Sequence, residues 1–355
     1  MSIVFAVLLT LSIMAPSLNP EKWPIAILFS LFFQYFFIIN FILAIYWLVR
    51  QRLYIILPLF PLVMGYNIFA RSFNIIIKDE VETNRPKINL LTYNTRLFDL
   101  YNWSHNLETR AKMFNYIKDT KSDIICLQEF YTDDNPKSKF SNIDTLKQIT
   151  GLKYETHHYT TTLHKTEHWG IVTYSRFPII NSGVFDFDGP NNNSCIFSDF
   201  IVRGDTFRVY NLHLESIRFA KNDYSFIDNI EKEKTENFNW RYAGTIAKKL
   251  MTASVARGKQ AERIHQHILK CPYPILVCGD FNDTPASYTY SVISPYLKDA
   301  FHSGKIGFGA TYNGPFPAFR IDQVLYSPYL KNLSYTIDKF SYSDHFPVRA
   351  VFQLP

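Results

Sequence analysis

The chain carries little charge for its length, and the shortage lies almost entirely at its N-terminal end. Asp, Glu, Lys and Arg make up 19% of the 355 residues, below the roughly 25% of an ordinary soluble domain. Between residues 1 and 70 the charged side chains are Glu21, Lys22, Arg50 and Arg52. From Arg71 onward the composition is that of a soluble protein. This change in composition predicts a domain boundary near Arg71.

Cysteine is also scarce, with four residues in the chain. The cysteines show no metal-ligand pairing and no dense spacing, so the sequence offers neither a zinc site nor a disulfide framework. Cys126 and Cys278 lie in apolar runs, which predicts buried thiols. We find no internal repeat and no low-complexity tract. The net charge of +6 suits an anionic partner, but it equally suits a membrane protein with basic loops.

Uncharged stretches in the first 70 residues indicate a membrane anchor. Residues 25–49 contain no charged side chain, and this stretch exceeds the ~20 residues that a helix needs to cross a bilayer. Residues 53–70 form a second such stretch, and residues 3–18 form a shorter one. A signal peptide is the competing interpretation of residues 3–18, but a basic segment and a small-residue cleavage site are missing. We therefore expect two or three transmembrane helices within an anchor over residues 1–71.

The loop between the second and third predicted spans gives the expected orientation. It reads Arg50-Gln51-Arg52, and short loops rich in arginine stay in the cytoplasm. The third span would then exit on the far side, although Arg71 and Lys78 act against this orientation. We expect an integral protein of the cell (inner) membrane, with a linker over residues 72–86 and an extracytoplasmic domain over residues 87–355.

Polar residues fall at the ends of apolar β-type runs in the second part of the chain. The runs lie at 87–93, 123–127, 170–174, 208–214, 273–278, 321–326 and 348–353. They alternate with helical patterns, as at 109–120 and 260–269, which predicts packed sheets covered by helices. A rigid sheet can aim side chains at its strand ends into a shared cleft. Carboxylate and amide oxygens suit Mg²⁺, and together with imidazoles they suit hydrolysis of a phosphate ester. The residues are Asn94, Glu129, Asn211, His213, Asp280, Asn282, Asp322, Asp344 and His345.

Taken singly, each of these residues also has an ordinary structural interpretation. Glu129 after an apolar strand is typical of a solvated loop residue, and His213 is compatible with a buried core histidine. Asp280 and the pair Asp344-His345 fit common turns. Their occurrence together is what points to a functional site.

Six segments surround these polar residues. They are Leu91-Thr92-Tyr93-Asn94, Ile125-Cys126-Leu127-Gln128-Glu129, Asn211-Leu212-His213-Leu214, Gly279-Asp280-Phe281-Asn282, Arg320-Ile321-Asp322 and Ser343-Asp344-His345. In this order they resemble the endonuclease/exonuclease/phosphatase superfamily across residues 88–353. That family includes deoxyribonucleases of the pancreatic type, abasic-site endonucleases, neutral sphingomyelinases and inositol polyphosphate 5-phosphatases. The resemblance implies an α/β fold, a four-layered sandwich of two packed mixed β-sheets flanked by helices.

The resemblance also implies a metal and its ligands. Glu129 would ligate the ion, with Asn94 and Asp344 as further ligands, and Mg²⁺ is the expected metal, with Mn²⁺ as the second candidate. Asn94 would also bind substrate, as would Asn211 and Asn282.

The implied catalytic residues surround the metal. Asp280 would deprotonate the attacking water, and Asn282 would hold a phosphoryl oxygen. His345 would donate to the phosphate, with Asp344 fixing its tautomer and orientation. The set is completed by His213, the family's second histidine, and by Asp322, which would support the network around His213 and Asn282.

The substrate is left open by these residues. An insertion over residues 216–256 combines basic and aromatic residues, which suits nucleic-acid contact, an anionic membrane surface or a mixed-charge helical cover. It borders the strand of His213 and is the predicted determinant of substrate choice. We expect a phosphodiesterase or nuclease acting on nucleic acid or a phospholipid head group, without an obligate protein partner. The alternatives are a lipid-directed phosphoesterase, of sphingomyelinase or phosphoinositide-phosphatase type, and a non-catalytic membrane-tethered binding protein.

Overall fold

The computed structural model describes residues 1–75, 86–187, 193–219, 223, 240–314 and 319–354. It divides into two compact units. The first comprises residues 1–73, 215–265 and 283–295, and the second comprises residues 74–214, 266–282 and 296–355. Most of the predicted linker and much of the predicted insertion, residues 76–85, 220–222 and 224–239, lie outside the described residues.

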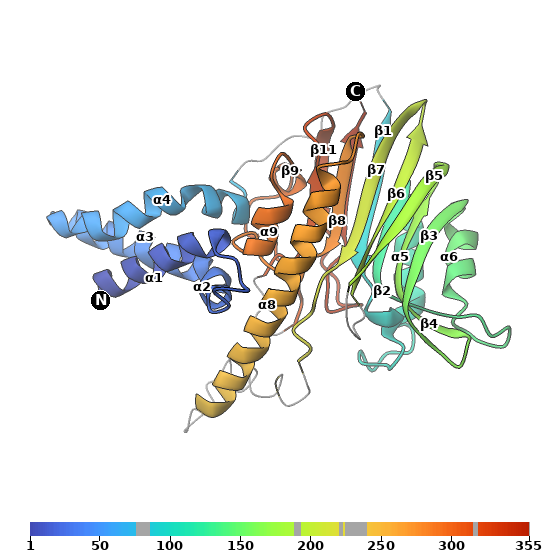
Figure 1. Ribbon diagram of the computed structural model, residues 1–355, viewed down its shortest axis with the longest axis horizontal. Helices are drawn as coiled ribbons and strands as arrows, with labels where there is room; N and C mark the ends of the chain where they lie inside the picture. Colours follow the sequence, from blue (N-terminus) through green and yellow to red (C-terminus); the bar gives the residue numbers. More distant parts are fainter. Residues whose placement is uncertain (76–85, 188–192, 220–222, 224–239, 315–318, 355) are drawn as a thin grey trace. The chain divides into compact units, whose positions relative to one another are not determined.

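Two six-stranded mixed sheets pack face to face in the second unit (Figure 1), as the resemblance implied. In each sheet one neighbouring pair is parallel, β1 with β2 and β7 with β8, and the other pairs are antiparallel. The first sheet has the order β11 (Lys331–Ile337), β12 (Val348–Gln353), β1 (Lys87–Asn94), β2 (Ile124–Asp133), β4 (Glu167–Ser175) and β3 (Tyr154–Leu163). The second has the order β5 (Ile179–Asp186), β6 (Ser194–Val202), β7 (Asp205–His213), β8 (Ile275–Asp280), β10 (Asp322–Tyr326) and β9 (Lys298–Asp299).

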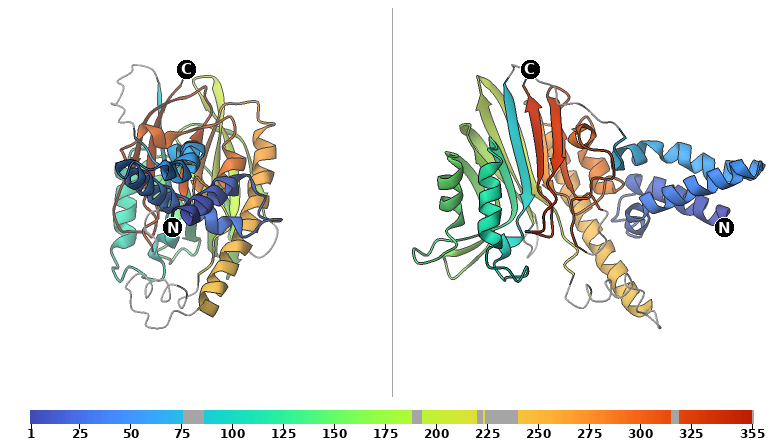
Figure 2. Two further views of the ribbon diagram at one scale, coloured as in Figure 1. Left: turned by 90° about the vertical axis from the view of Figure 1, so that its left-hand side faces the viewer. Right: turned by 180° about the vertical axis from the view of Figure 1, so that it is seen from behind.

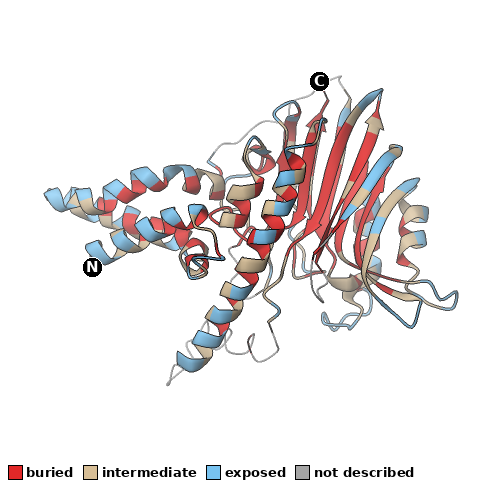
Figure 3. Cartoon of the chain, viewed as in Figure 1, coloured by how far each residue is buried: buried red, intermediate tan, exposed pale blue. Residues whose placement is uncertain are grey.

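Alternation along the strands creates two apolar cores, because successive side chains point to opposite faces of a sheet. Leu90, Cys126 and Cys278 lie in the core between the sheets, which confirms that both thiols are buried. Leu91 and Tyr93 point the other way and pack with α5 (Thr109–Asp119) and α6 (Asn142–Thr150) on the outer face of the first sheet (Figure 2). The central strands are accordingly buried along most of their length (Figure 3).

Strand direction brings the predicted site residues to one edge of the sandwich. Asn94 and Glu129 lie where the parallel strands β1 and β2 reach the same edge. His213 stands opposite Asp280 at the ends of the parallel strands β7 and β8. Asp322 begins the antiparallel strand β10 and therefore also pairs with Asp280. The polar ends of strands that are distant in sequence thus meet.

The first unit consists of helices and their connections. The N-terminal helices pack through Leu9, Phe33, Phe37, Leu62 and Ile68. They are α1 (Ser2–Met14), α2 (Ala26–Leu31), α3 (Phe33–Val49) and α4 (Ile56–Ser72), with short 3₁₀ turns η1 (Ala15–Ser17) and η2 (Leu53–Ile55). The unit also contains α9 (Tyr288–Ile293) and most of α8 (Trp240–Ile268).

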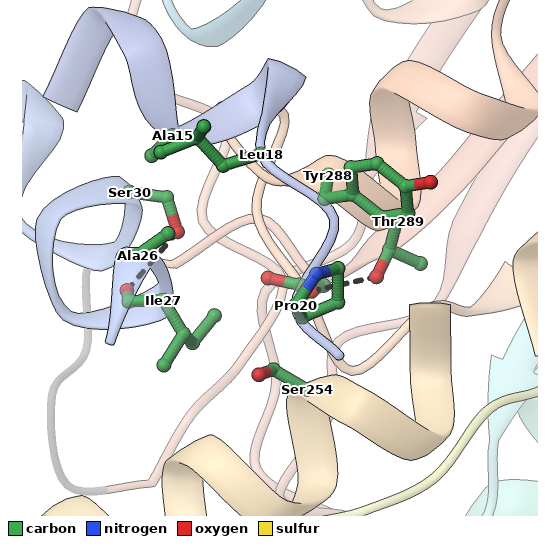
Figure 4. Close-up of a pocket in the computed structure, with 10 residues that line it drawn as sticks. Ala15, Leu18, Pro20, Ala26, Ile27, Ser30, Ser254, Tyr288 and Thr289 are labelled. Carbon is green, nitrogen blue, oxygen red and sulfur yellow. Dashed lines mark hydrogen bonds between the residues drawn. The ribbon is translucent and has the colours of Figure 1, made fainter. Parts of the chain in front are cut away.

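Contacts within this unit join the N-terminal segment to α8. Asn19 donates to Glu262 at 2.9 Å, and Lys259 lies 2.9 Å from Glu21. A small pocket in the same unit is lined by residues of η1, α2, α8 and α9, among them Ser30 and Ser254 (Figure 4). The predicted anchor and the described part of the predicted insertion therefore belong to one packed unit.

The structure does not support an anchor of several spans. Among the described residues, one helical stretch, Leu53–Ser72 with 20 residues, is long and apolar enough to cross a membrane. The predicted span at 25–49 is broken at Phe32, between α2 and α3, and α3 has 17 residues. At 1.5 Å per residue α3 is about 26 Å long, short of the ~30 Å hydrocarbon core. The 13 residues of α1 fall further short.

Candidate active site

The backbone is irregular at the two strand ends that carry Glu129 and Asn282. The register of β2 against β4 shifts between Leu127 and Phe130, which marks a bulge that contains Glu129. Glu129 has a φ of 45° and Asn282 a φ of 51°, both in the left-handed region that side chains disfavour. Gly279 has a φ of 130°, and a Cβ there would lie 2.1 Å from the Leu212 carbonyl oxygen. Glycine is therefore required one residue before Asp280.

Asp280 is the centre of the hydrogen-bond network at this edge. Its carboxylate accepts hydrogen bonds from the Asn94 side chain at 3.0 Å and from the Asn282 backbone N–H at 2.8 Å. The Asn282 amide also donates to the carboxylate at 3.2 Å and to the Leu214 carbonyl at 3.0 Å. Burial raises the pKa of Asp280, although the nearby His345 acts to lower it. A buried carboxylate with a raised pKa is suited to accept a proton.

His345 is held by Asp322 rather than by the predicted Asp344. The distance between His345 Nδ1 and Asp322 Oδ2 is 2.9 Å, and His345 Nε2 lies 3.6 Å from Asp280 Oδ2. Burial lowers the pKa of His345, but Asp322 and Asp280 outweigh it and hold this pKa well above its usual value. The predicted support by Asp322 of His213 and Asn282 stays a prediction, while its bond to His345 is a contact that the sequence did not indicate. The reason is topological, since β10 begins beside the end of β8.

Glu129, Asp344 and Asn94 form the side of the site that a cation fits. Burial, followed by the negative charge of Asp344, raises the pKa of Glu129 to about 7, and a hydrogen bond from Asn94 acts against this rise. His213 Nε2 lies 3.7 Å from Glu129 Oε1 and 3.8 Å from Asp280 Oδ2. Two neighbouring carboxylates and an amide oxygen are hard ligands whose surplus negative charge a divalent cation would neutralise.

A second group of ligand atoms lies deeper in the site. Asp280, Asp322 and His345 offer atoms that lie within 4.8 Å of one another. Several of these atoms already have hydrogen-bond partners, since Asp322 holds His345 and Asp280 accepts from Asn94. We therefore interpret this buried group as an acid–base array and the Glu129 side as the better cation site.

Asn211 does not face the site as predicted. Its side chain is fully buried between the sheets, where it accepts from Gln128 at 2.7 Å and donates to the Val172 carbonyl and to Thr173. All polar groups of this amide are thus used inside the core, and these contacts give no support to the predicted binding of substrate by Asn211. The hydrogen bond to Gln128 instead ties the strand of His213 to the strand of Glu129.

Two residues near the site were missed in the sequence. Thr311 is fully buried, and its hydroxyl accepts hydrogen bonds from the backbone N–H groups of Ile321 and Asp322, both at 3.0 Å. Arg96 lies 3.4 Å from Asp344. The other site residues were predicted because they follow apolar runs, and neither Thr311 nor Arg96 ends such a run. The position of Arg96 two residues after Asn94 was the one indication in the sequence.

The family follows from comparison with known proteins. The model of the Endonuclease/Exonuclease/phosphatase family matches residues 91–345, which is more than half of the chain. The chain belongs to this family. Its members are hydrolases that act on phosphoester bonds and generally depend on divalent metals. A second family model, described as a domain of unknown function, matches residues 1–72.

Solved structures of other proteins have a similar fold. A family protein from Bacteroides vulgatus is 18% identical, with a TM-score of 0.55 over 76% of this chain and 100% of that one. The human Nocturnin catalytic domain is 19% identical, with a TM-score of 0.52 over 81% and 98%. A mannosyl-6-phosphatase from Bacteroides thetaiotaomicron is 19% identical, with a TM-score of 0.50 over 75% and 99%. No curated protein matched the sequence.

Proposed function

We propose that the chain is a divalent-metal-dependent phosphodiesterase that cleaves its substrate by direct attack of water. The observation that carries this proposal is the position of Asp280, a buried carboxylate with a raised pKa that touches Asn94 and lies beside His213 and His345. Family membership supports hydrolysis of a phosphoester. A Mg²⁺ ion held by Glu129, Asn94 and Asp344 would supply positive charge at the phosphoryl oxygens.

In this proposal the side chains of the site divide the chemistry among them. Asp280 orients the attacking water and takes its proton. The Asn282 amide, fixed by the Leu214 carbonyl, positions a phosphoryl oxygen. His345 carries a proton because its pKa is well above the usual value, so it donates to the phosphate as negative charge builds up. Asp322 holds the tautomer and orientation of His345.

Removal of divalent metal tests this function. The purified full-length protein should hydrolyse bis(p-nitrophenyl) phosphate in the presence of Mg²⁺ and lose that activity with excess EDTA, and added Mg²⁺ should restore it. The release of p-nitrophenol measures the rate. Equal rates in EDTA and Mg²⁺ would show that the oxygen-rich site does not serve catalysis.

The N-terminal helices favour membrane attachment, and with it a lipid-directed enzyme as the second candidate function. Val49, Leu53 and Val63 are 75%, 93% and 68% exposed, and many other large apolar side chains of residues 1–66 are also exposed. Exposed apolar surface of this extent is typical of a membrane or protein contact. A membrane tether would raise the effective concentration of lipid head groups. We also propose a domain boundary near residue 71 and a catalytic domain on the extracytoplasmic side of the membrane.

Membrane attachment is tested by fractionation of cells that produce the full-length protein. We expect the protein in the membrane pellet, and we expect it to remain there after an alkaline carbonate wash, because the 20-residue stretch Leu53–Ser72 is long enough to span the bilayer. Release by the wash would limit the contact to the membrane surface, and recovery in the soluble fraction would contradict attachment.

A further inference from the structure

The loop after β1, residues 95–108, presents two exposed aromatic side chains. The proposed metal and acid–base chemistry does not use them. Tyr101 is 59% exposed and Trp103 is 40% exposed. Their rings pack edge to face with centroids 5.1 Å apart. Aromatic rings that the fold leaves at the surface as a pair are well suited to stack on a ligand.

Arg96 connects this aromatic pair to the candidate active site. Its guanidinium lies 4.7 Å from the centre of the Trp103 ring, within the range of a cation–π contact. On its other side Arg96 Nε lies 3.4 Å from Asp344 Oδ2, and the Arg96 backbone N–H donates to Asn94 Oδ1 at 3.1 Å. The guanidinium therefore stands between the aromatic pair and a predicted metal ligand, where it can pair with a substrate phosphate.

The loop is held in shape by packing on α5 and β2 and by hydrogen bonds within the loop. Phe98 is 1% exposed and packs on Phe114 and Phe130, with ring centroids 5.1 and 5.4 Å away. Asp99 Oδ1 accepts a hydrogen bond from the backbone N–H of Ser104 at 3.1 Å. Residues 96–99 all have positive φ, a conformation that persists only where its surroundings fix it. A ligand would thus meet a largely preformed surface, which lowers the entropic cost of binding.

We propose that Arg96, Tyr101 and Trp103 bind the nucleoside group of a phosphodiester substrate, with the base stacked on the aromatic pair and Arg96 paired with the phosphate. This inference rests on the proposed function and names its substrate class. The neighbours of the rings favour a base over an acyl chain, because most of the exposed residues near them in the chain are polar, among them Asn102 and His105, with Leu107 as the exposed apolar residue. It also places substrate choice in the loop after β1 rather than in the insertion at 216–256.

Two substrates that share a leaving group test the inference. Thymidine 5′-(p-nitrophenyl phosphate) carries a nucleoside, whereas methyl p-nitrophenyl phosphate does not. For the full-length protein with Mg²⁺, Trp103→Ala should raise KM for the nucleoside substrate about 10-fold, as the loss of base stacking implies. Its kcat/KM for the methyl ester should fall much less than its kcat/KM for the nucleoside substrate, because only the latter carries a base, and Trp103→Phe should keep KM near that of the wild type. The matched control is Trp240→Ala, an exposed tryptophan of the first unit.

Three results would overturn the inference: an equal effect of Trp103→Ala on both substrates, no effect on either, or a rise in KM from Trp240→Ala instead. If the wild type hydrolyses neither substrate, the proposed function fails, and the inference is then decided by binding alone. Calorimetry with thymidine 5′-monophosphate should show about 10-fold weaker binding to Trp103→Ala than to the wild type. Equal affinity of the two proteins would reject the nucleoside site.

Discussion

Asp280→Asn should lower kcat for bis(p-nitrophenyl) phosphate by roughly 10²- to 10⁴-fold, the range expected for the loss of a general base. Asparagine keeps the size of the side chain but cannot take a proton from water. Asp280 is 1% exposed and is surrounded by hydrogen-bond donors, so the variant also replaces an acceptor with an amide. Circular dichroism and the melting temperature establish whether the variant is folded.

The matched control for this variant is Asp205→Asn, at the exposed start of β7. It makes the same chemical change on a strand that also carries His213, and it should leave kcat unchanged. If a folded Asp280→Asn protein had the kcat of the wild type, Asp280 could not be the general base. The hydrolysis would then have to be assigned to another group of the site.

Glu129→Gln should raise the Mg²⁺ concentration needed for half-maximal activity by at least about 10-fold. Even residues that only orient a metal ligand commonly contribute 10- to 100-fold to metal affinity, and Glu129 is proposed as a direct ligand. Glutamine removes the charge that attracts the cation, while it retains a weaker oxygen ligand. A Mg²⁺ titration of the rate measures the shift, and calorimetry with Mn²⁺ measures the binding itself.

Glu108→Gln provides the comparison for the metal titration. Glu108 precedes α5, and its side chain is 75% exposed, so the same substitution there should not alter the Mg²⁺ requirement. An unchanged requirement in Glu129→Gln would place the metal elsewhere in the site. The buried group Asp280, Asp322 and His345 would then be the candidate.

Apolar runs that end in polar residues allowed much of the fold and site to be predicted. The runs at 87–93, 208–214 and 273–278 correspond to β1, β7 and β8. The pattern works there because these strands are buried and because parallel pairs place their ends at one edge. Strands β3, β5, β6, β9 and β11 were not predicted. The exposed and polar surface of β3 shows one reason, since few of its side chains lie in a core.

The contacts of individual site residues were harder to predict, because they depend on strand order. Asp344 precedes His345 in the chain, yet Asp322 holds the imidazole, since β10 starts beside the end of β8. Asn211 alternates with His213 along β7, yet it bonds inside the core to Gln128. A sequence shows which side chains share a strand, but not which strands are neighbours.

The helix lengths in the first 72 residues were overestimated for a related reason. The sequence shows the length of an uncharged apolar stretch, but it does not show whether a single helix runs through the whole stretch. The stretch at 25–49 contains two helices that meet at Phe32. The family model that matches residues 1–72 ends close to the change in composition at Arg71.

The most direct measurement of the central claim is the position of Mn²⁺ in the protein, located by anomalous diffraction from crystals grown with the ion. We expect one ion bound by Glu129 together with Asn94 or Asp344, with the Asp322–His345 hydrogen bond intact. An ion held instead by Asp280, Asp322 and His345 would contradict the proposed mechanism, because the groups assigned to proton transfer would then be metal ligands.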